Sequence, residues 1–169
     1  MDNAPFLNES YNMNDDKKLT DMKKVTIKIP VESYELIELK GNNLPAICLV
    51  NKSLVKFEHQ DIFPWFCTLT LDLKDLDSKD MPTDSEKEVL NAFFNKLDAE
   101  LKKEHNGLFV ARVTWNKTQQ LVWRLHDPVI ADDFIQSIIE SEDHPRAFDY
   151  AINNDPQWTK SNWLLDPLK

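Results

Sequence analysis

The chain has 169 residues, of which 41% are hydrophobic and 10% aromatic, and its formal net charge is −9. This length and composition predict one globular domain, and the acidic balance makes nucleic acid and anionic membranes poor partners. Only two glycines occur, Gly41 and Gly107, so the glycine-rich loops that bind nucleotides are excluded and no cofactor is predicted.

The first third of the chain divides into a polar tail and a set of short strands. Residues 1–22 are polar and aperiodic, which predicts a disordered tail. The tail lacks the basic and apolar regions of a signal peptide, and no apolar run is long enough to cross a bilayer, so we expect a cytoplasmic protein. Residues 23–62 predict an antiparallel β-meander with strands at 25–29, 34–39, 46–50 and 54–59.

Residues 63–153 alternate between strand and helix patterns. Residues 65–73 alternate apolar and polar positions, as a half-buried strand does. Thr83 and Glu86 have the spacing of a capping box, and the helix that follows is expected to stop at Asn106–Gly107. A hairpin at 109–125, a helix opened by Asp127–Pro128 and a last strand at 144–152 complete this segment.

The order of these elements is strand, helix, strand, strand, helix, strand. That order predicts an α+β fold, specifically a ferredoxin-like βαββαβ sandwich with a four-stranded antiparallel sheet and two helices on one face. Residues 154–169 are expected to add a short C-terminal helix that starts at Asp155–Pro156.

The hairpin supplies the candidate binding residues. Its alternation places Phe109, Ala111, Val113 and Trp115 on the same face as Leu121, Trp123 and Leu125. The opposite face then carries the candidates Asp72, Arg112, Thr114, Arg124 and His126.

Two interpretations of Arg112 and Arg124 follow. They could bind a carboxylate or an acidic segment of a partner, because arginine offers a planar fork of donors. Alternatively, they could form ordinary cross-strand ion pairs with Asp72, Asp149 or carboxylates of the meander. We favour the structural interpretation.

No catalytic or metal-binding motif is present. Cys48 and Cys67 lie in apolar runs and are expected to be buried, reduced thiols. The four histidines lack metal-ligand spacing, and adjacent carboxylates such as Asp132 and Asp133 point apart on a helix. No serine or cysteine has the surroundings of a nucleophile, so we expect a protein that is not an enzyme.

Several stretches resemble the bacterial family called domain of unknown function 695. The resemblance extends from about residue 33 to 165 and is most specific at Arg112–Asn116 and Asp155–Trp158, with further similarity in 35–54, 64–73, 81–94 and 109–128. It implies no catalytic residues. The chain is also similar, more remotely, to the regulator of ribonuclease activity B, a small acidic protein that acts by binding an enzyme.

Two hypotheses about function follow. The first is a non-catalytic protein-binding or regulatory module that uses exposed sheet edges; an immunity-type inhibitor of a basic toxin is one variant. The second is a small-ligand sensor or enzyme that uses a cleft between the polar sheet face and the N-terminal meander.

Overall fold

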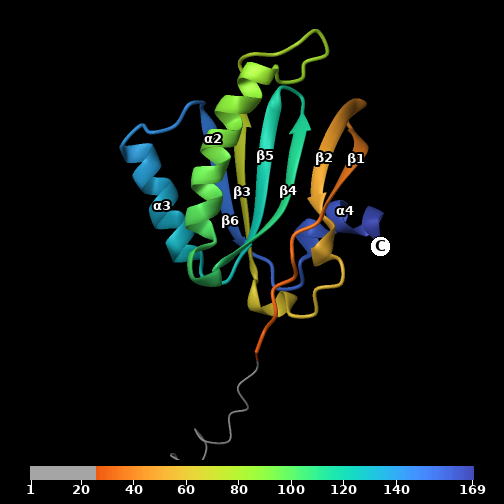
Figure 1. Ribbon diagram of the computed structural model, residues 1–169, viewed down its shortest axis with the longest axis vertical. Coiled ribbons are helices and arrows are strands. Elements are labelled where there is room, and N and C mark those ends of the chain that lie inside the picture. Colours follow the sequence, from red (N-terminus) through yellow and green to blue (C-terminus); the bar gives the residue numbers. More distant parts are fainter. Residues whose placement is uncertain (1–25) are drawn as a thin grey trace, which may run out of the picture.

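The computed structural model describes residues 26–169 and shows one sheet with helices on both faces (Figure 1). Five short 3₁₀ segments, the first at 52–54 and the last at 166–168, join the regular elements. In chain order the strands and α-helices are β1 (Tyr34–Gly41), β2 (Leu44–Asn51), β3 (Trp65–Asp72), α2 (Asp84–Leu101), β4 (Gly107–Trp115), β5 (Thr118–Leu125), α3 (Pro128–Glu140), β6 (Phe148–Asn154) and α4 (Asn162–Leu165).

The sheet has six strands in the order β1-β2-β4-β5-β3-β6, and every neighbouring pair is antiparallel. The predicted α+β class is confirmed, but the predicted four-stranded sheet is wrong in its number of strands. The cause is the pairing of β2 with β4, in which Cys48 lies opposite Val113. The hairpin β1–β2 therefore extends the same sheet.

The predicted meander is only half correct. Its second and third strands are present as β1 and β2, whereas residues 54–59 form no strand. Instead, the chain turns irregularly between β2 and β3 and buries Leu54, Phe57 and Phe63 against the sheet. The strand predicted at 25–29 is wrong over 26–29, the part that is described, and the predicted tail at 1–22 lies outside the described residues.

The predicted helix starts are confirmed at both long helices. The Thr83 side chain accepts a hydrogen bond from the Glu86 backbone N–H, and Asp127 caps α3 in the same way through Val129 N–H. Helix α2 ends at Leu101, five residues before the predicted stop. Gly107 instead allows a close approach, because a Cβ there would lie 2.5 Å from the Leu101 carbonyl oxygen.

Each face of the sheet has its own core. Helices α2 and α3 cover one face, which we call the helix face; the turn between β2 and β3 and the segment that includes α4 cover part of the other, the opposite face (Figure 1). Buried residues of the helix-face core include Leu69, Leu97, Trp123 and Ile135, and those of the opposite core include Cys48, Phe63, Val110 and Trp158.

A β-bulge in β4 decides which hairpin residues reach which core. Phe109 lies opposite Trp123, but Ala111 lies opposite Val122, so the alternation shifts by one residue between them. Phe109 packs in the helix-face core, while Ala111 and Val113 pack in the opposite core. The prediction that Phe109, Ala111, Val113 and Trp115 share one face is therefore wrong beyond Phe109.

Candidate functional site

The bulge also separates the two arginines that the sequence placed together. Arg112 follows the bulge and reaches α2 on the helix face, whereas Arg124 lies on the opposite face against the C-terminal segment. The predicted cluster of Arg112, Arg124 and His126 on one face does not form.

Arg124 is fully buried and cross-links the C-terminal segment to the sheet. Its Nη2 lies 2.7 Å from an Asp155 carboxylate oxygen, and its Nε and Nη2 both donate to the Ser161 hydroxyl. The guanidinium carbon lies 4.8 Å from the ring centres of both Phe66 and Trp158. The partners predicted for this arginine, Asp72, Asp149 or a meander carboxylate, were wrong.

The Asp155 carboxylate is held in its charged form. Burial alone would raise the pKa of Asp155, but hydrogen bonds from Thr159, Arg124 and the Lys160 N–H outweigh it and lower the pKa to about 2. Burial lowers the pKa of Arg124, and Asp155 opposes that effect. The pair is a structural cross-link, in which each guanidinium nitrogen of Arg124 donates at least one hydrogen bond to Asp155 or Ser161.

Arg112 is different, because within residues 26–169 it has no carboxylate partner. Its Nη1 donates to the Asn91 side-chain oxygen at 2.9 Å, and its guanidinium carbon lies 4.8 Å from the Phe94 ring centre. The Nε atom is buried without a hydrogen-bond partner among those residues. Burial lowers the pKa of this arginine, and the neighbouring Tyr34 acts in the other direction.

The remaining three candidates are dispersed. Thr114 is buried opposite Gln119 on the helix face, and Asp72 is exposed at the end of β3. The Nδ1 atom of His126 lies 2.8 Å from the Ile62 carbonyl oxygen. His126 also lines an open hollow of about 600 Å³ together with His105, one wall of which is the irregular segment 27–29.

A second buried ion pair was missed by the sequence analysis. Glu86 accepts two hydrogen bonds from Arg146, at 2.9 and 2.6 Å, and one from the Lys74 backbone N–H. The hydrogen bonds from Arg146 lower the pKa of Glu86 to about 2, against the opposing effect of burial. The capping-box spacing identified Glu86, but its carboxylate serves the segment before β6 rather than the Thr83 N–H.

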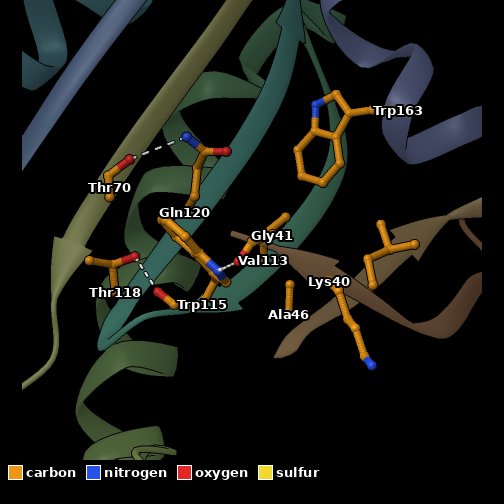
Figure 2. Close-up of a pocket in the computed structure, with 10 residues that line it drawn as sticks. Lys40, Gly41, Ala46, Thr70, Val113, Trp115, Thr118, Gln120 and Trp163 are labelled. Atoms are coloured by element: carbon orange, nitrogen blue, oxygen red, sulfur yellow. Dashed lines mark hydrogen bonds between the residues drawn. The ribbon is translucent and has the colours of Figure 1, made fainter. Parts of the chain in front are cut away.

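A second hollow, of about 550 Å³, lies on the opposite face, where the C-terminal segment leaves the sheet uncovered (Figure 2). We call it the tryptophan hollow. Its apolar lining residues are Leu39, Ala46, Val113, Trp115 and Trp163. It lies between the meander strands and the polar residues of β3 and β5, and Trp163 adds a wall that the sequence-based hypothesis did not include.

Trp115 is fixed in the floor of this hollow. Its indole N–H donates to the Gly41 carbonyl oxygen at 3.0 Å, and the Thr118 hydroxyl donates to its backbone carbonyl at 2.7 Å. A Cβ on Gly41 would lie 3.2 Å from the indole nitrogen, so this glycine permits the close packing. Trp163 is the opposite case, since 46% of it is exposed at the rim.

One wall of the hollow is polar but uncharged. Thr70 of β3 and Gln120 of β5 are joined by a hydrogen bond of 3.4 Å from the Gln120 amide nitrogen to the Thr70 hydroxyl. Lys40 is the one charged lining residue in the part of the chain that the structure describes, and Figure 2 shows its ammonium pointing away from the hollow. The walls can therefore stack on a ligand and form hydrogen bonds with it. The described residues that form them include no carboxylate, imidazole or thiol for acid–base or nucleophilic chemistry.

Residues 26–169 contain neither a candidate metal site nor a candidate membrane-spanning helix. Within that range no group of three or more His, Cys, Asp or Glu side chains is placed to hold a metal ion. None of the helices in the same range has the length and apolar character required to cross a bilayer. Cys48 and Cys67 are buried and unpaired, and burial raises their thiol pKa values to about 11 and about 12.

Comparison with known protein families identifies the family to which the chain belongs. Residues 33–165 match the family of unknown function DUF695, and because the match covers most of the chain, the protein belongs to this family. No curated protein and no solved structure matches the chain. The resemblance seen in the sequence is thus confirmed at the level of the family, while a bacterial origin and the similarity to the regulator of ribonuclease activity B stay predictions.

Proposed function

We propose that this protein is a non-catalytic binding module whose ligand is a small molecule bound in the tryptophan hollow. The observation that carries the proposal is the hollow itself: about 550 Å³, mostly apolar, with a few polar groups on one wall. Small-molecule sites in proteins have this size and this mixture of side chains. The floor and the polar wall belong to paired strands of the sheet, which hold them rigidly.

The proposal is tested by a thermal-shift screen of small compounds against three proteins. These are the wild type, Trp163→Ala in the rim of the hollow, and Tyr34→Ala as a control. Tyr34 is exposed to a similar degree, 38%, and contacts Phe109 of the helix-face core. We expect compounds that raise the melting temperature of the wild type and of Tyr34→Ala but not of Trp163→Ala. A screen without any such compound would count against the proposal.

A second candidate function, protein binding, is favoured by the part of the helix face that none of the described helices covers. There Leu36 of β1 is 63% exposed and lies opposite Leu49, which in turn lies opposite Arg112. An exposed leucine next to a guanidinium without a carboxylate suits a partner segment that presents an apolar side chain and a carboxylate.

This candidate predicts that one partner depends on both residues. In capture from a lysate with stepped salt elution, Leu36→Asp and Arg112→Gln should each lose the same protein, and Trp163→Ala should retain it. Equal capture of that protein by the wild type and all three variants would rule out this surface as the binding site.

A further inference from the structure

The walls of the tryptophan hollow define the chemistry of the molecule that fits it. We propose that the hollow binds an uncharged, flat aromatic molecule that carries an amide-like edge, in which a hydrogen-bond acceptor lies next to a donor. This inference rests on the proposed function and narrows it to one class of ligand.

The aromatic part of the ligand follows from the two tryptophans. Figure 2 shows Trp163 of α4 on one side of the hollow and Gln120 and Thr70 on the other, with Trp115 between the strands below. Trp115 is locked by its hydrogen bond to Gly41, whereas the Trp163 ring remains about half exposed. A planar ring system gains most from such a site, because it can stack on the free indole while its edge reaches the polar wall.

The amide-like edge follows from Gln120 and Thr70. A glutamine side chain offers one carbonyl acceptor and two N–H donors, and within residues 26–169 one N–H of Gln120 is used, toward Thr70. Its carbonyl oxygen points away from Thr70, toward the side of the view on which Trp163 lies (Figure 2). The Thr70 hydroxyl accepts the bond from Gln120 and keeps its own proton to donate. A ligand with adjacent C=O and N–H groups matches this set.

The absence of charge on the ligand follows from the walls. Among residues 26–169, no Asp, Glu, Arg or His lines the hollow, and the ammonium of Lys40 is directed away from it. A carboxylate or an ammonium would lose its hydration without gaining an ionic partner, which is costly. The net charge of −9 further disfavours anions.

Four naphthalene derivatives test the inference: naphthalene-2-carboxamide, naphthalene, 2-naphthoate and 2-naphthylmethylammonium. Each is titrated into the full chain while the tryptophan indole N–H signals are followed by NMR. We expect the carboxamide to bind about tenfold more tightly than naphthalene, since it adds hydrogen bonds to the polar wall. We expect both charged probes to bind at least about tenfold more weakly than the carboxamide, because they bury an unpaired charge.

Variants of the lining residues show which wall of the tryptophan hollow contributes to the affinity for each probe. Gln120→Leu and Thr70→Val should each weaken the carboxamide toward the level of naphthalene and leave naphthalene itself unchanged. Trp163→Ala should weaken both, and Tyr34→Ala should weaken neither. Thermal melts confirm that each variant is folded, and the two polar-wall variants on different strands give independent tests.

The outcomes separate this inference from the proposed function. If naphthalene or a charged probe binds as tightly as the carboxamide and loses affinity in Trp163→Ala, the ligand class is wrong and the binding site stands. If no probe shifts the Trp163 signal at about 1 mM, the weak end of specific binding, the ligand class is also wrong. The thermal-shift screen then decides separately whether the hollow binds any compound.

Discussion

Arg124 and Arg112 lie on the two strands of one hairpin, yet their surroundings are opposite in almost every respect. Arg124 is fully buried, paired with Asp155 and held between two aromatic rings. Arg112 is partly buried, rests on Phe94 and has an asparagine where a carboxylate would be expected. Every guanidinium nitrogen of Arg124 donates a hydrogen bond inside the fold, whereas the buried Nε of Arg112 has no partner among the described residues.

Residue type and alternation along a strand therefore do not by themselves define a site. A single additional residue in β4 sends the two guanidinium groups to different faces. One of them becomes part of the core, while the other borders an exposed surface.

Deletion of Val110 should have the largest effect, because it removes the bulge. Without it, either Arg112 or Phe109 and its neighbours must change faces, and a charged or large side chain would enter the wrong core. We expect no cooperatively folded protein, as measured by circular dichroism and urea titration. Val110→Ala is the control, since it keeps the bulge and should cost only about 1–3 kcal/mol. A folded deletion variant would contradict the role given to the bulge.

Replacement of Arg124 by Gln should have the next largest effect. It leaves the Asp155 carboxylate buried without its cation, so we expect a loss of roughly 3–5 kcal/mol in the free energy of unfolding, measured by urea titration. The double variant Arg124→Gln/Asp155→Asn should recover part of this loss, because the unpaired charge is gone. A loss below about 1 kcal/mol would show that the pair is not a cross-link.

Acid should weaken the protein through both buried pairs. The pKa values of Glu86 and Asp155 are lowered to about 2 in the folded protein, below their ordinary values of 4.5 and 3.8. Their stabilising contribution is therefore complete above about pH 5 and is lost as the pH falls toward 2. We expect the free energy of unfolding to drop by roughly 2–3 kcal/mol between pH 6 and pH 3.

Urea titrations at several pH values measure this drop. In Glu86→Gln, which is less stable throughout, the free energy of unfolding should fall less steeply over the same range. If the free energy of unfolding fell equally steeply in that variant, Glu86 would not contribute to the acid sensitivity.

Replacement of Arg112 by Gln should have the smallest effect. The cation–π contact with Phe94 is lost, but the cost of holding a partly buried charge without a carboxylate disappears as well. We expect the free energy of unfolding to change by less than about 1 kcal/mol, with either sign. If Arg112→Gln lowered the free energy of unfolding as much as Arg124→Gln does, the two arginines would both be structural cross-links, which would contradict this comparison.

Much of the fold could be predicted because its signals are local. Thr83 and Asp127 cap their helices through residues two or three positions ahead, and the alternation at 65–73 marks a strand with two different faces. The turn between β2 and β3 was mistaken for a strand because its apolar residues contact the core from an irregular segment. The pairing of β2 with β4 also depends on partners more than sixty residues apart.

The candidate site was predicted less well for the same reason. Asp155 lies 31 positions from Arg124, and no local pattern connects them. The bulge did have a signal, since the four consecutive apolar residues at 108–111 break the alternation of the hairpin. The tryptophan hollow had none, because it arises where the C-terminal segment stops covering the sheet.

The position of the Arg124 cross-link has a consequence for the protein during its synthesis. Arg124 and its strand emerge from the ribosome well before Asp155, which lies 31 positions later, and before Trp158 and Ser161. Until those residues appear, the nascent chain exposes a cationic strand face together with the apolar surface that Trp158 later covers. The opposite core can therefore close only after residues 155–161 have left the ribosome, and a chain truncated before Asp155 would present this surface to chaperones and proteases.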